Sequence, residues 1–202
     1  MDKPHHPGPD PASRSRFIDR DSYYVQAQPS YPPHAFVDER RIAFDPASPT
    51  GFVALDHREA LGTGWPATTP AMLARYARIR RGESLESRFR ASGEIYYVIA
   101  GAGSSRNGEH TSVQWRAGDV VCFDGGERTL HLAGDDDCLL WAVTDEPLLS
   151  FLGVAAAPGH RRVAGPLHFS AAAIAEALAA ALRREQAKGT ASNGNAAFIF
   201  SS

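Results

Sequence analysis

The chain has 202 residues, of which 43% are hydrophobic and 22% charged, as expected of one globular domain that buries a real core. Its 21 basic and 23 acidic residues leave a formal net charge of −2, which argues against a nucleic-acid partner. No apolar run approaches the length of a membrane span, and residues 1–30 contain no run resembling a signal peptide, so we expect no membrane contact and a cytoplasmic location.

The first segment, residues 1–35, is rich in proline and polar side chains. Such a composition buries too little apolar surface to fold alone, so we expect a flexible N-terminal arm. Residues 36–70 show no clear helical period. The aromatic residues that would let the arm dock onto a partner subunit are Tyr23, Tyr24, Tyr31 and Phe36.

From residue 72 onward, short apolar runs are separated by turn residues, with no helical pattern between them. Asn107 and Gly108 predict a two-residue hairpin, because both residues tolerate positive φ. Strands at this spacing indicate an all-β sandwich or barrel. The expected strands cover residues 72–80, 85–91, 95–100, 111–115, 120–123, 129–132 and 138–143.

The C-terminal part contains one convincing helix, over residues 171–188, with Ser170 as its N-cap and Gly189 as its stop. Ile174, Leu178 and Leu182 recur at helical spacing and give this helix one packing face. A strand-like run follows at 196–200.

Cys122 and Cys138 are the only cysteines, and both lie in apolar strand-like runs. A disulfide framework normally needs more cysteines, so we expect two buried free thiols.

A motif with regular spacing begins at Gly82. Five residues lie between Gly82 and Arg88, and one residue lies between Arg88 and Arg90. Three residues then precede Glu94, and six more precede Gly101. This pattern resembles the first part of the cupin signature, G-x5-H-x-H-x3-E-x6-G. The resemblance implies an all-β cupin double-stranded β-helix (jelly-roll) barrel over 36–155, preceded by the flexible arm at 1–35 and followed by one C-terminal helix.

In the family, three histidines and one glutamate suit Fe(II) or a similar ion. Here Arg88, Arg90 and Thr129 stand at the histidine positions, and only Glu94 remains. Arginine has no lone pair for a metal, so we expect no metal in this barrel, and Fe(II) only if the family's activity is retained. His131 lies two residues beyond Thr129 and on the same face of that strand.

Two interpretations of these residues stay open. In the structural one, Glu94 pairs with Arg88 or Arg90 inside the barrel, which offsets the cost of burying charge. In the functional one, these arginines form a pocket for a small aromatic or aliphatic carboxylate, because arginine binds carboxylates bidentately. The expected pocket residues are Arg88, Arg90, Glu94, Thr129 and His131.

Residues 66–153 further resemble one half of the gentisate 1,2-dioxygenase-like bicupins, which contain two barrels. Residues 156–202 are similar to their connector and to the entry of a second barrel that is missing here. The run at 196–200 can also be a simple edge strand.

The resemblance suggests two functions. The first is a metal-free barrel that binds a small carboxylate or serves as a scaffold. The second is an Fe(II)-dependent aromatic ring-cleaving dioxygenase of gentisate or salicylate type, with its metal site outside this chain or formed on oligomerisation. Cupin barrels commonly pair through their sheets, so a homodimer is expected.

Overall fold

The computed structural model describes residues 33–110, 112–155 and 165–187. Nearly all of the expected N-terminal arm and the expected strand at 196–200 lie outside these ranges. No helix within them is long and apolar enough to cross a membrane.

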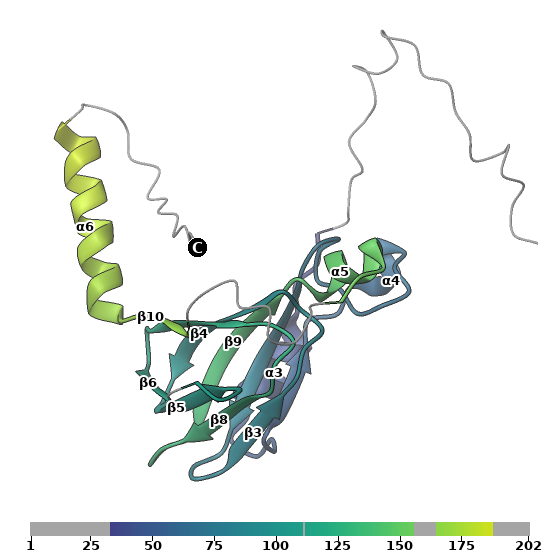
Figure 1. Ribbon diagram of the computed structural model, residues 1–202, viewed down its shortest axis with the longest axis horizontal. Coiled ribbons are helices and arrows are strands. Elements are labelled where there is room, and N and C mark those ends of the chain that lie inside the picture. The colour runs from purple at the N-terminus through teal and green to yellow at the C-terminus, as the bar shows by residue number, and fades with distance from the viewer. Residues whose placement is uncertain (1–32, 111, 156–164, 188–202) are drawn as a thin grey trace, which may run out of the picture. The chain divides into compact units, whose positions relative to one another are not determined.

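Two antiparallel sheets face each other and form the barrel (Figure 1). The six-stranded sheet has the order β1 (Gly51–Ala54), β2 (Leu73–Ile79), β9 (Cys138–Thr144), β4 (Gly93–Ala100), β7 (Val120–Asp124) and β10 (Leu167–Phe169). The four-stranded sheet has the order β3 (Ser84–Ser87), β8 (Thr129–Ala133), β5 (Ala102–Asn107) and β6 (Val113–Arg116). The helices are α3 (Val37–Phe44), α4 (Arg58–Leu61), α5 (Glu146–Leu152) and α6 (Ala171–Ala187).

The core lies between the inner faces of the two sheets. Side chains alternate along each strand, so on β4 residues 94, 96 and 98 point inward while 95 and 97 point outward. The inward tyrosine Tyr96 packs in this core with Trp115, Phe123 and Leu140. These buried apolar side chains supply the main driving force for closing the barrel.

Several elements differ from the sequence-based expectation. Strands β1, β5 and β10 and the short helices α3, α4 and α5 were not predicted. The hairpin between β5 and β6 exists, but its connection covers residues 108–112 and is not a two-residue turn. Asn107 is buried and hydrogen-bonded within the barrel, so the residue expected to make the turn is part of the core.

At Gly103, the backbone of β5 lies close to β8 and to the indole of Trp115. A Cβ atom built there would lie 2.3 Å from the carbonyl oxygen of Leu132 and 2.6 Å from the indole of Trp115. Both distances are below van der Waals contact, so any side chain at this position would displace the indole.

The C-terminal helix begins as predicted, because Ser170 Oγ accepts a hydrogen bond from Ala173 N at 3.2 Å. Its start is also held to the barrel through Asp119. The Asp119 carboxylate accepts from Ala171 N at 2.8 Å and lies 2.9 Å from His168 Nε2. No described residue of α6 is buried. On the predicted apolar face, Ile174 and Leu178 are half-buried and Leu182 is exposed.

Both cysteines are free thiols, as predicted. Cys138 is buried in the core, whereas Cys122 on β7 is half-buried and faces outward. Burial raises the pKa of the Cys122 thiol to about 11, so it is a poor nucleophile at neutral pH.

Candidate functional site

The expectation that Arg88 and Arg90 point into the barrel is wrong, because both are exposed. Strand β3 ends at Ser87, which pairs with Thr129 on β8 and is buried with it. Since side chains alternate along an extended segment, Ser87 and Phe89 take the inward positions and the two arginines face out. Arg88 only donates a long hydrogen bond, 3.4 Å, to the carbonyl of Gly126.

Glu94 is buried in the barrel without an arginine partner. Tyr96 donates its hydroxyl to Glu94 Oε2 at 2.7 Å, and Thr129 donates to the same oxygen at 3.1 Å. The ion pair between Glu94 and Arg88 or Arg90 is therefore also a wrong expectation. Two neutral hydroxyl groups replace it.

Of the remaining predicted residues, Thr129 contacts Glu94 and His131 packs on Tyr96, and each has a partner on β5. Asn107 Nδ2 donates to Thr129 Oγ1 at 2.8 Å. Ser105 Oγ lies 2.7 Å from His131 Nδ1 and accepts from Trp115 Nε1 at 2.7 Å. The sequence placed Thr129 and His131 correctly on one inner face, but it gave no indication of these β5 partners.

Three buried polar atoms in this network have no hydrogen-bond partner among the described residues: Glu94 Oε1, Asn107 Oδ1 and His131 Nε2. None of these three atoms is accessible to solvent. The imidazole of His131 packs on Tyr96, with ring centroids 4.5 Å apart. The inside of the barrel is thus a filled polar core and leaves no room at these atoms for a substrate-sized molecule.

Burial shifts the titration of both ionisable groups of this core. Desolvation raises the pKa of Glu94 to about 7, although the hydroxyls of Tyr96 and Thr129 act in the opposite direction. Burial lowers the pKa of His131 to about 3. His131 is therefore neutral at physiological pH, and Glu94 is partly protonated.

The arginine that does point inward is Arg75 on β2, which the sequence analysis missed. It donates to Thr144 Oγ1 at 3.0 Å, forms an ion pair with Glu146 on α5, and lies 4.2 Å from the centroid of the Phe89 ring. A charged residue in the middle of an apolar strand was the available signal. Because Glu146 neutralises it, Arg75 is not a free anchor for a carboxylate ligand.

These residues do not fit an Fe(II) centre. Within the described ranges no group of three or more His, Cys, Asp or Glu side chains is placed to hold a metal ion. Glu94 and His131 are the two candidate donors of the barrel core, and the phenol of Tyr96 contacts both. Fe(II) sites of this kind use more nitrogen and carboxylate ligands, with open positions for substrate.

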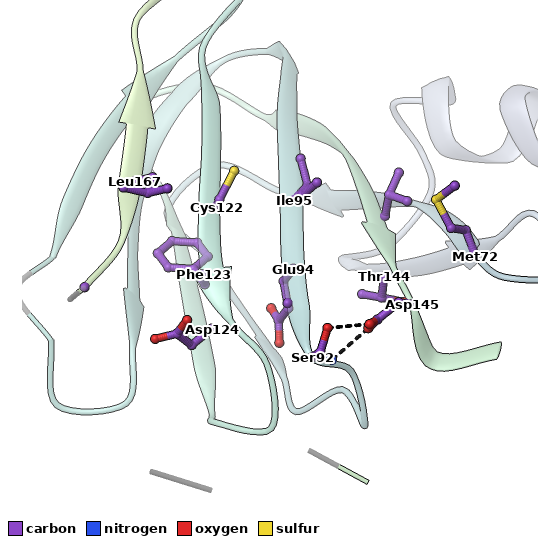
Figure 2. Close-up of a pocket in the computed structure, with 13 residues that line it drawn as sticks. Met72, Ser92, Glu94, Ile95, Cys122, Phe123, Asp124, Thr144, Asp145 and Leu167 are labelled. Atoms are coloured by element: carbon purple, nitrogen blue, oxygen red, sulfur yellow. Dashed lines mark hydrogen bonds between the residues drawn. The ribbon is translucent and has the colours of Figure 1, made fainter. Parts of the chain in front are cut away.

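A separate pocket of about 420 Å³ lies at the end of the six-stranded sheet where β4 begins and β7 and β9 end. Figure 2 shows most of its apolar side chains in one row across the strands and its acidic side chains in a second row at the strand ends. The apolar row contains Leu167, Cys122, Ile95 and Met72, and Val143 is the register partner of Ile95. The polar row contains Asp124, Glu94, Ser92, Thr144 and Asp145, and Phe123 lies between the two rows. Apart from Glu94, none of these residues was predicted as a site residue from the sequence.

Comparison with known proteins finds a dioxygenase of similar sequence. No family model matches the chain. A 5-aminosalicylate 1,2-dioxygenase from a Comamonas species is 31% identical over 141 residues, which cover 63% of this chain and 37% of that protein. The chain thus matches little more than a third of the relative's length.

A solved structure shows a similar fold. A variant of salicylate 1,2-dioxygenase from Pseudoaminobacter salicylatoxidans superposes with a TM-score of 0.59 at 17% identity, over 83% of this chain and 58% of that one. The described residues therefore form a barrel of the cupin double-stranded β-helix type, similar in fold to this dioxygenase.

Proposed function

We propose that this chain is a metal-free cupin barrel that acts as a scaffold and pairs with a second copy through the outer face of its six-stranded sheet. The observation that carries the proposal is the chemistry of that face. A sheet with one solvated face normally alternates apolar-in and polar-out side chains. On this sheet, the outward positions of the central strands are apolar as well.

The outward side chains form a continuous apolar band across neighbouring strands. Tyr97 on β4 pairs with Trp141 on β9 and with Val120 on β7, and Trp141 pairs with Tyr76 on β2. Tyr97 is 43% exposed and Trp141 is 41% exposed, although both are large aromatic residues. Contiguous exposed apolar surface of this kind typically marks a protein interaction site.

A second copy is the partner that the band suits best. In a two-fold dimer the same patch meets itself, so an apolar, uncharged band is complementary to its own copy. Aromatic residues are enriched in the buried centre of interfaces, where Tyr97 and Trp141 would lie. The proposal therefore places these two side chains at the two-fold axis.

The oligomeric state of the purified full chain tests this proposal. We expect a dimer by light scattering coupled to size-exclusion chromatography, and a monomer for the double variant Tyr97→Glu with Trp141→Glu. Leu132→Glu is the matched control, because Leu132 is 47% exposed but lies on the four-stranded sheet. A monomeric native chain, or a double variant that remains dimeric, contradicts the proposal.

The iron content of the purified protein tests the proposal that the chain binds no metal. We expect purified protein to contain far less than one iron per chain after loading with Fe(II) and removal of excess metal. Stoichiometric iron together with gentisate-dependent oxygen uptake would show instead that the chain works as a dioxygenase.

Binding of a small carboxylate inside the barrel has less support. The two arginines expected to hold it are exposed, Arg75 is paired with Glu146, and the core atoms are closed off. A rise in melting temperature with salicylate that disappears in Arg75→Ala would restore this interpretation.

One observation favours a second function, an Fe(II)-dependent aromatic ring-cleaving dioxygenase whose metal site lies outside this chain or forms on oligomerisation. It is the 31% identity with the 5-aminosalicylate 1,2-dioxygenase, which extends over 141 residues. Oxygen uptake with 5-aminosalicylate, gentisate and salicylate, measured on iron-loaded protein, tests this function. No uptake with any of the three acids would exclude it for this chain.

A further inference from the structure

The pocket at the end of the six-stranded sheet has the size and layout of a small-molecule site. Its volume of about 420 Å³ lies within the range of roughly 300–1,000 Å³ that is typical of ligand pockets. Register pairs bring its apolar row together, since Ile95 on β4 is opposite both Cys122 and Val143, and Leu167 on β10 is opposite Cys122. An apolar body can therefore lie flat against four strands.

The polar end of this pocket is acidic. Asp124, Glu94 and Asp145 line it, whereas none of the described lining residues is lysine, arginine or histidine. Figure 2 shows these three carboxylates along the strand ends, below the apolar row. A negative, partly enclosed rim of this kind favours a cation and disfavours a carboxylate.

One of these carboxylates has capacity for a further donor. Asp145 accepts from Ser92 N at 2.7 Å and from Ser92 Oγ, but it forms no ion pair with a described basic residue. Each carboxylate oxygen has two lone pairs, so Asp145 can accept from a ligand as well. The charge of Asp145 thus lies at one end of an apolar pocket.

We propose that this pocket binds a small organic cation, an amine with an aromatic or branched aliphatic body. The body lies on Ile95, Cys122 and Val143, and the ammonium group donates to the acidic rim at Asp145. This site is distinct from the filled barrel core. It is also separate from the proposed dimer band, because Tyr97 and Trp141 do not line the pocket.

Three probes with the same body and different head groups test the proposal on the full chain. Isothermal titration with benzylamine, benzyl alcohol and benzoate should show benzylamine binding at least about tenfold more tightly than benzyl alcohol. Benzoate should bind more weakly than either. Absence of benzylamine binding, equal affinity for the amine and the alcohol, or tighter binding of benzoate would overturn the proposal.

Two pairs of variants locate the site. Asp145→Asn should weaken benzylamine binding at least about fivefold, whereas Asp135→Asn, which removes one exposed carboxylate outside the pocket, should leave it unchanged. Ile95→Trp fills the pocket and should abolish binding, whereas Leu132→Trp adds an indole at an exposed position of the four-stranded sheet, outside the pocket, and should not. If Asp145→Asn does not fold, the second pair of variants tests the site. Equal affinities for Ile95→Trp and Leu132→Trp would show that the amine binds elsewhere.

Discussion

The inner and outer faces of strand β4 differ in the kind of side chain that each carries. On the inner face, Glu94 and Tyr96 belong to a closed network of hydrogen bonds with Thr129. On the outer face, Ile95 and Tyr97 are more than 40% exposed. Polar groups of this strand thus lie in the core, and large apolar groups lie at the surface. The comparison shows that the usual alternation of apolar-in and polar-out side chains is reversed on part of β4.

The largest expected difference between the two faces comes from neighbouring tyrosines. Tyr96→Ala removes a fully buried ring and the hydroxyl that binds Glu94, so it should lower the free energy of unfolding by about 4 kcal/mol. Tyr97→Ala removes a half-exposed ring and should cost less than about 1 kcal/mol at concentrations where the protein is monomeric. Urea unfolding of both variants measures the difference, and equal losses would contradict the assignment of the two faces.

Glu94 should make the core less stable as pH rises. Its pKa is raised from 4.5 to about 7, so its contribution is fully present below pH 4.5 and is lost as pH rises through 7. The stability of the native protein relative to Glu94→Gln should fall by roughly 3 kcal/mol between pH 4.5 and 7.5. Chemical denaturation at each pH measures this difference, and a constant difference would show that Glu94 titrates normally.

His131 should have the opposite effect. Its pKa is lowered from 6.5 to about 3, so its contribution is present above pH 6.5 and is lost as pH falls toward 3. The stability of the native protein relative to His131→Gln should fall by roughly 2 kcal/mol from pH 6.5 to 4.5. The same denaturation series measures it. Because the two groups act in opposite directions over this interval, their effects should largely cancel in the native protein and appear only in the variants.

The smallest effect is expected at the surface arginines. Arg88→Ala together with Arg90→Ala should change the free energy of unfolding by less than about 0.5 kcal/mol, since both side chains are exposed. Arg75→Ala is the comparison, because it leaves Glu146 without its partner in a half-buried position and should cost more. Thermal melts of the two proteins measure the difference. A large loss in the double variant would indicate that these arginines hold the barrel together after all.

Much of the barrel could be predicted because most of its strands carry branched or aromatic residues in short runs. Strand β5 was missed because its sequence, Ala-Gly-Ser-Ser-Arg-Asn, has no such run. It is a strand because β6 and β8 pair with it on both sides, which is a tertiary effect. The buried roles of Ser105 and Asn107 follow from this pairing and have no signal in the local sequence.

The site was harder to predict because orientation depends on where a strand ends. The spacing of the family motif placed Arg88 and Arg90 inward, but β3 ends at Ser87 and its inward positions are Ser87 and Phe89. A shift of one residue in an extended segment reverses which side chains face the core. Glu94 and His131 were placed correctly because each lies within a paired strand.

The contacts of Asp119 also determine how the barrel would respond to a pulling force on its C-terminal side. Strand β10 pairs with β7 over only three residues, and Asp119 adds its bonds to His168 and to the first amide of α6. By contrast, β9 pairs with both β2 and β4 along nearly its whole length. Tension applied through α6 would therefore break the Asp119 contacts and release β10 first, while the remaining strands stay paired. The force needed for this release would be set by the short β10 ladder together with the Asp119 carboxylate.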